Sequence, residues 1–335
     1  MKNFTKLALV SSIAFSANAM AMQAMDDAAL SSTTGQDGIN IGLGISKVTI
    51  DKVFVHDNDG LADAALGGTS KAGAITIQGT TDPKKAKEIT LTDGTKISSA
   101  DFGVFVGANY SEGGKYLLGT HNLADLVIDT DAGTAAQGGA FINIAAQVSG
   151  LEIHIGEIGV TASGTQGTAT SAIRRGGDTT NYNAILSGLG LKTGQMTANV
   201  QLGAAPQGAM IKLNSVMQGG LEITNLGILD SSTKSVTGTP GEILIDSIKV
   251  ANADGKDLDL KSSISVYGAS ANTGNGFLRI VNEDTKGIDT YVKGIHLGSA
   301  AASSIGDVEV QGLRTYYSTA PGVFTQGSVI TVSGH

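Results

Sequence analysis

The sequence predicts an all-β fold, either an elongated β-solenoid built from repeats or a long stacked β-sheet, with a β-sandwich as the alternative. Composition is the first observation: glycine is 47 of 335 residues, aromatic residues are 4%, and tryptophan is absent. Ile, Val, Leu and Thr fill short alternating runs between glycine and Asx turns. Such runs are typical of strands that bury one face.

An internal repeat is the second observation. Each copy pairs a short apolar run with a second run that opens with glycine: 141–144 with 150–155, 210–213 with 220–225, and 277–280 with 287–292. The opening glycines, Gly150, Gly220 and Gly287, stand 70 and 67 residues apart. A repeat that cannot bury its apolar face alone must pack on its neighbours, so we expect one repeat-built β domain over 38–335, with equivalent segments near 125–160, 197–230 and 262–298. Ile153, Ile223 and Thr290 should then occupy corresponding positions, and Leu151, Leu221 and Ile288 should form one buried row.

The first element along the chain is a predicted signal peptide at residues 1–21. Lys2 and Lys6 precede the apolar run 7–15, and small residues follow at Ala19 and Ala21. A basic start, a short apolar stretch and small residues at the cleavage site are typical of secretory leaders. The run is shorter than the roughly 20 residues that span a bilayer. We therefore expect export to the periplasm, the outer membrane surface or a pilus.

A short helix and turn are expected at residues 22–37. Asp26 and Asp27 suit the positive end of a helix, and Gly35 is placed to end it in a left-handed cap. This segment has two interpretations, a cap over the open end of the repeat stack or a docking element for secretion or assembly.

The remaining elements are strands separated by glycine-rich turns. Alternation predicts them at 39–45, 47–55, 74–78, 88–92, 103–107, 125–129, 141–145, 151–155, 184–190, 197–202, 209–214, 221–229, 243–250, 260–267, 276–281, 288–297, 307–314 and 328–332. Residues 161–182 and 231–240, rich in Gly, Ser and Thr, are predicted to be loops.

Charge and cysteine content exclude several classes. Loss of Lys2 and Lys6 with the leader leaves 20 basic residues against 30 acidic ones, so binding to nucleic acid through charge is not expected. The chain has no cysteine, so burial and backbone pairing must hold the fold without disulfides. No later stretch is long and apolar enough to predict a transmembrane span.

The start of the predicted mature chain resembles a known family. Residues 22–31 read MQAMDDAALS and residues 34–39 read TGQDGI, directly after the leader. This opening resembles the FilA-like secreted proteins of Gram-negative bacteria, which carry a pilus-system label. The similarity extends loosely through 48–50 and 53–60. The resemblance implies a surface or pilus-associated role, and it supplies no catalytic residues.

One aspartate cluster is a candidate calcium site. Asp57, Asp59 and Asp63 place oxygen ligands around Gly60, as loops that wrap a hard cation do. The cluster departs from the EF-hand pattern, because Gly68 stands where the twelfth-position glutamate is needed. Ordinary Asx turns are the competing interpretation.

Catalytic patterns have less support. The five histidines lack metal-ligand spacing, and His154 and His296 are expected to be half-exposed sheet residues. There is no cysteine nucleophile and no Gly-x-Ser-x-Gly elbow. A β-helical polysaccharide-active enzyme is the second alternative, although the chain has few arginines to hold acidic sugars. We expect no enzyme activity and no cofactor other than calcium.

The predicted function is that of a non-catalytic secreted surface or pilus-system structural or assembly protein, with an adhesin for host matrix or glycan as the alternative. The last strand has no charge between Arg314 and His335 to discourage edge pairing. We therefore expect Val329, Ile330 and Val332 to bind pilus-system or envelope partners, unless the strand at 39–45 does so.

The leader gives the first testable prediction. Because Ala19 and Ala21 mark two cleavage sites, the mature chain should begin at Met22 or Met20. N-terminal sequencing of protein from the cell envelope checks this. Recovery there of a chain that begins at Met1 would contradict it.

Overall fold

The computed structural model describes residues 38–81, 86–165, 173–233, 238, 240–269 and 276–334. The chain divides into two compact units, Met1–Ile39 and Asn40–His335. The predicted signal peptide at 1–21 and the predicted helix at 22–37 lie outside the described residues. The fold that follows is that of the second unit.

The all-β prediction is confirmed, because two large antiparallel sheets contain most of the strands. We name them sheet A and sheet B. In spatial order sheet A contains β1 (Ile39–Leu43), β8 (Ala124–Asp131), β9 (Phe141–Val148), β14 (Met196–Gly203), β15 (Ile211–Met217), β18 (Leu258–Tyr267), β19 (Phe277–Asn282) and β24 (Ser328–Ser333).

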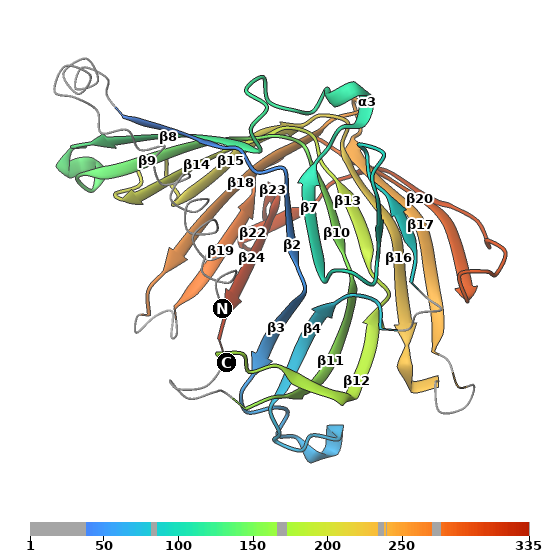
Figure 1. Ribbon diagram of the computed structural model, residues 1–335. Coiled ribbons are helices and arrows are strands. Elements are labelled where there is room, and N and C mark those ends of the chain that lie inside the picture. Colours follow the sequence, from blue (N-terminus) through green and yellow to red (C-terminus); the bar gives the residue numbers. More distant parts are fainter. Residues whose placement is uncertain are drawn as a thin grey trace, which may run out of the picture. The chain divides into compact units, whose positions relative to one another are not determined.

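Sheet B has one main run and one branch. The main run contains β2 (Lys47–Ile50), β7 (Val104–Ala108), β10 (Leu151–Ile155), β13 (Leu189–Lys192), β16 (Leu221–Asp230), β17 (Gly241–Asn252), β20 (Ile288–Gly298) and β21 (Val308–Leu313). The branch leaves β16 through β12 (Gly177–Leu186), β11 (Glu157–Ser163), β4 (Gly73–Gln78) and β3 (Lys52–Asp57). These four strands lie together in Figure 1.

Smaller elements lie between these strands along the chain. They are the hairpins β5 (Glu88–Thr90) with β6 (Lys96–Ser98) and β22 (Tyr316–Ala320) with β23 (Val323–Gln326), the 3₁₀ turns η1 (Ala64–Leu66), η2 (Ala135–Gln137) and η3 (Ser231–Thr233), and the short helix α3 (Ser111–Gly114). No described helix has the length and apolar character needed to cross a membrane.

The two sheets share one strand order because each long strand passes from one sheet into the other. Thus β9 continues into β10, β15 into β16 and β19 into β20 (Figure 1). The result is one antiparallel meander of eight long, bent strands. A β-solenoid stacks parallel strands, so the antiparallel order excludes the solenoid and leaves the stacked sheet and the β-sandwich among the forms that the sequence predicts.

The sequence repeat marks these bends. Gly150, Gly220 and Gly287 each stand where a long strand leaves sheet A and enters sheet B. The motif recurs in every second long strand, because alternate strands of a meander run in the same direction. Glycine is required at Gly150, where a Cβ would lie 2.6 Å from Tyr116 Cβ and 2.7 Å from Thr193 O.

The rows across sheet B correct part of the expected equivalence. Ile153 and Ile223 share a row, since both pair with Leu191. Thr290 was expected in that row, but Val292 occupies it, because Gly287 lies two residues further from the row than Gly150 and Gly220 do. Leu151, Leu221 and Ile288 were expected to form one buried row, yet they are only partly buried and Ile288 pairs with Asn252.

Two predicted boundaries are wrong. The predicted loop 161–182 contains the end of β11 and the start of β12, and only 166–172 within it lies outside the described residues. The first half of β12 is polar and exposed, so it lacks the alternation that marks strands. The predicted strand 184–190 is interrupted at Ser187 and Gly188, where Gly188 has a φ of 107°, although the strands on both sides pair with β16.

Aliphatic rows run across the sheets and hold the strands in register. The row in sheet A contains Ile128, Ile144, Val200, Ile211, Ile264, Ile280 and Ile330, one from each of seven neighbouring strands. Each cross-strand aliphatic pair stabilises the sheet by roughly 0.2–1 kcal/mol. A separate buried cluster of Leu91, Phe102 and Phe105 packs residues 89–102 against sheet B.

Gly103 and Gly156 lie where the main run of sheet B meets its branch, and we call this line of glycines the seam. The site described below lies beside it. The N–H of Gly156 donates to the carbonyl of Gly103 at 2.7 Å, and that of Gly103 donates to Ile50 at 2.8 Å. Gly156 also reverses the alternation of its strand, so that Glu157 is buried together with Glu152 although the two are five residues apart.

Substitution at the seam should destabilise the fold. A Cβ at Gly156 would lie 2.3 Å from the carbonyl oxygen of Gln78, so Gly156→Ala should lower the free energy of unfolding by about 1–3 kcal/mol. Gly119→Ala is the matched control, since nothing lies within 4 Å of its Cβ position. Urea denaturation measures both, and equal stability of the two variants would contradict the close approach.

Candidate functional site

The predicted partner-binding residues lie on the last strand of sheet A. In β24, Val329 pairs with Val281, Ile330 with Ile280 and Val332 with Leu278. The strand order ends at β24, so its other edge has no neighbour among the described strands of that sheet. The side chains of Ile330 and Val332 are 56% and 55% exposed, whereas Val329 is partly buried. This edge therefore presents apolar side chains and unpaired backbone groups.

The alternative docking strand lies at the opposite end of sheet A. The predicted strand 39–45 corresponds to β1, which pairs with β8 and is the other terminal strand. Its sequence, INIGL, carries no charge, and its side chains are exposed. Both strands that the sequence singles out are thus edges of one sheet. Uncharged, exposed edges are templates for a further strand.

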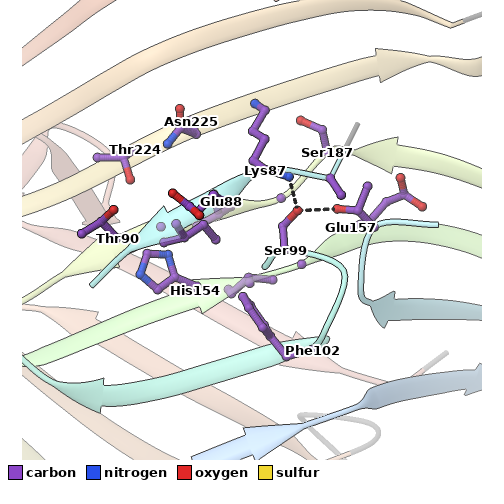
Figure 2. Close-up of a pocket in the computed structure, with 18 of the residues that line it drawn as sticks. Lys87, Glu88, Thr90, Ser99, Phe102, His154, Glu157, Ser187, Thr224 and Asn225 are labelled. Carbon is purple, nitrogen blue, oxygen red and sulfur yellow. Dashed lines mark hydrogen bonds between the residues drawn. The ribbon is translucent and has the colours of Figure 1, made fainter. Parts of the chain in front are cut away.

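A cleft of about 680 Å³ is a second candidate site, which sequence reasoning missed. It lies on sheet B beneath the β5–β6 hairpin. Figure 2 shows Lys87, Glu88, Ser99 and Phe102 from the hairpin side and His154 and Glu157 from the sheet. Ser99 Oγ accepts a hydrogen bond from the Lys87 backbone N–H at 2.9 Å, which closes the hairpin side of the cleft.

Glu152 is the most constrained carboxylate of the cleft. It is 2% exposed, and its Oε2 accepts hydrogen bonds from the backbone N–H and the hydroxyl of Thr92 at 2.7 and 2.6 Å. His154 Nε2 lies 3.1 Å from Oε1. Burial raises the pKa of Glu152, but the hydrogen bonds from His154 and Thr92 outweigh it, and the pKa is lowered overall. The expectation that His154 is half-exposed is wrong, because the hairpin covers it.

Glu157 also binds the part of the chain that contains the hairpin. Its Oε1 accepts hydrogen bonds from the hydroxyl of Thr81 at 3.0 Å and from Tyr182 Oη at 2.8 Å. Burial and the neighbouring Glu157 charge raise the pKa of Tyr182, so the phenol stays protonated and donates. Glu152 therefore binds the turn of the hairpin and Glu157 binds the segment that precedes it, which is a structural use of their acceptor capacity.

One sequence signal points to this cleft. Glu152 and Glu157 interrupt the apolar pattern of 151–160, and Gly156 between them marks a change of face. Thr92 and Thr81 lie 60 and 76 residues away in the sequence, so no local pattern predicts that they donate to these carboxylates.

Of the predicted calcium residues, Asp57 ends β3, Asp59 lies in the loop that follows, and Asp63 stands directly before η1. Asp63 caps η1 by accepting the N–H of Ala65 at 2.9 Å, and Asp57 Oδ1 lies 3.4 Å from the N–H of Asp59. Among the residues that the structure describes, no three His, Asp or Glu side chains converge as metal ligands would. Calcium binding by Asp57, Asp59 and Asp63 stays a prediction.

Comparison with known proteins gives one match. Residues 1–103 match the model of a family described as a family of unknown function, DUF6160. No curated protein and no solved structure matches the chain. The matched part contains β1 to β6, hence one edge of each large sheet and the hairpin over the cleft.

The lowered pKa of Glu152 gives a prediction about pH. Its stabilisation should be complete above the unfolded-state pKa of about 4.3 and be lost as pH falls through the lower folded-state value. At neutral pH, Glu152→Gln should lower the free energy of unfolding by about 1.5–3 kcal/mol, because hydrogen bonds to a charged group are lost.

The measurement is urea denaturation of both proteins between pH 7 and pH 2. The difference in stability should narrow at the acidic end, since the native glutamate is then protonated. Thr92→Val serves as the partner control, because it removes one donor and keeps the carboxylate. A difference that is constant across pH would show that Glu152 does not act as a charged acceptor.

Proposed function

We propose that this chain is an exported, non-catalytic structural or assembly protein of a bacterial surface or pilus system, and that it works by pairing its edge strands with a partner strand. The observation that carries the proposal is β24. It is a six-residue terminal strand without charge, and its apolar side chains at Ile330 and Val332 are exposed.

Strand addition suits this edge physically. An added strand would form backbone hydrogen bonds along β24, and alternate side chains would contact Ile330 and Val332. Natural sheets protect free edges with lysine, proline or bulges. The sequence of β24, SVITVS, has no lysine and no proline, and its pairing with β19 has no bulge.

Three further observations support the proposed export, the pilus-system class and the absence of catalysis. Lys2, Lys6 and the apolar run that follows form a secretory leader pattern. The segment 22–39 resembles secreted proteins with a pilus-system label. The hydrogen bonds at Glu152 and Glu157 support a role without catalysis, because the best-placed carboxylates are occupied by Thr and Tyr donors.

An adhesin that binds matrix or glycan is the second candidate. Tyr267 and Phe277 stack with ring centroids 4.9 Å apart, and Tyr267 is exposed. Stacked rings at a surface are a platform for a sugar face. The pair lies beside the edge strand, because Phe277 pairs with Ser333 of β24.

A single charge on the edge tests the proposal. Ile330→Lys should abolish co-purification with envelope partners, because an edge lysine disfavours strand addition, while the melting temperature changes little at this exposed position. Val216→Lys is the matched control: Val216 is 46% exposed on the interior strand β15, so co-purification should persist.

The two readouts separate the possible outcomes. If Ile330→Lys lowers the melting temperature as much as it lowers partner recovery, β24 is simply part of the folded core. If neither changes, assembly through this edge is excluded. Loss of glycan binding on Tyr267→Ala with partner recovery intact would favour the adhesin.

A further inference from the structure

The two free edges of the main run of sheet B point in opposite directions. β2 and β21 are its terminal strands, and seven antiparallel ladders connect them through the strands between. An odd number of reversals makes β2 antiparallel to β21. A second copy in the same orientation would therefore bring its β2 antiparallel to β21 of the first, and the meander would continue without a break.

An aliphatic row reaches both of these edges. It contains Val48, Val106, Ile153, Leu191, Ile223, Ile248, Val292 and Val308, in pairwise register from β2 to β21. The terminal members, Val48 and Val308, are 39% and 46% exposed. They are the two members that have an aliphatic neighbour in the row on one side alone, so contact between them would extend the row.

The adjacent row, on the other face, has six charged members, whose signs alternate once the uncharged Gly107 and Tyr291 are passed over. It contains Lys47, Gly107, Glu152, Lys192, Glu222, Lys249, Tyr291 and Glu309. Within it, Glu222 lies 3.8 Å from Lys192 and 4.0 Å from Lys249. The row begins with a cation on β2 and ends with an anion on β21. Opposite charges on directly opposed residues favour pairing.

We propose that the partner of both edges of the main run of sheet B is a second copy of the same chain. β2 of one copy pairs antiparallel with β21 of the next, with Val48 opposite Val308 and Lys47 opposite Glu309. This inference rests on the proposed function, pairing of edge strands, and specifies its partner and register. The contact is head-to-tail, so each copy keeps one free edge and chains of copies can grow.

Sheet A is compatible with the same arrangement. Its terminal strands β1 and β24 belong to the first and last long strands of the meander, as β2 and β21 do. Both are uncharged and exposed, so they oppose a second copy with no unpaired charge. A register fixed at sheet B would therefore be continued by backbone pairing in sheet A.

The competing interpretation is that Lys47 and Glu309 protect the edges from association. Protection requires a charge, but neither a particular row nor opposite signs. The two charges occupy the same row, and their signs continue the alternation among its charged members. Reversal of both charges together distinguishes the interpretations, since it preserves complementarity.

Cysteine pairs test the register directly, because the chain has no cysteine of its own. Cβ atoms of directly opposed residues lie about 4.5–5.5 Å apart, which a disulfide can bridge with a small adjustment. Lys47→Cys mixed with Glu309→Cys should give a disulfide-linked dimer under mild oxidation, and neither variant alone should. The control is Lys47→Cys mixed with Val308→Cys, whose side chains lie on opposite faces and should not react.

Charge reversal tests the sign pattern by sedimentation at low salt. Lys47→Glu and Glu309→Lys should each weaken self-association roughly tenfold, and the double variant should restore it. Higher salt should weaken the native contact, because exposed charges are screened. If the double variant associates no better than the single ones, the opposed charges do not determine the contact.

The outcomes separate this inference from the proposed function. Self-assembly is overturned if the native chain stays monomeric at high concentration and the mixture of Lys47→Cys with Glu309→Cys forms no disulfide-linked dimer. The effect of Ile330→Lys on recovery of envelope partners would still report on strand pairing with another protein. Equal crosslinking by the control pair would overturn the register.

Discussion

The structure depends on a common register across eight long antiparallel strands. With no cysteine in the chain, stability rests on backbone ladders and on rows of aliphatic side chains such as Ile128, Ile144 and Val200. A slip of one residue would move every side chain of a strand to the other face. The register is therefore specified collectively, and the glycines at the bends allow it to persist from one sheet into the other.

An open meander necessarily leaves two edges, and the edge strands of the two sheets differ in charge. The edges of sheet A carry no charge, whereas those of the main run of sheet B carry Lys47 and Glu309. Edge strands without charged side chains pair with little selectivity, while opposed charges on two strands select the partner and the register. In the proposed self-association, the charged edges of sheet B would therefore specify the contact and the uncharged edges of sheet A would strengthen it. Strand pairing at sheet A is also the basis of the proposed function.

The sequence predicted those features that depend on local alternation. Residues 151–155 coincide with β10, and the absence of charge near Ile330 favours an edge strand, which is the place of β24 in the strand order. The exposed strand β12 was missed because its polar residues bury no regular face. The cleft was missed because Glu152 and Glu157 share a face only after Gly156 reverses the alternation. Strand order and the place of Thr290 depend on tertiary pairing, which no local pattern contains.

The buried carboxylates also anchor a segment next to the edge strand β2. Residues 79–103 interrupt the second long strand between β4 and β7, and β7 is the sole neighbour of β2 in the main run of sheet B. Glu157 binds Thr81 near the start of this insertion and Glu152 binds Thr92 in its hairpin turn, and the N–H of Gly103 donates to Ile50 at the end of β2. The ladder between β7 and β10 positions β7, and with it Lys47 and Val48, while the two carboxylates anchor the insertion that leads into β7.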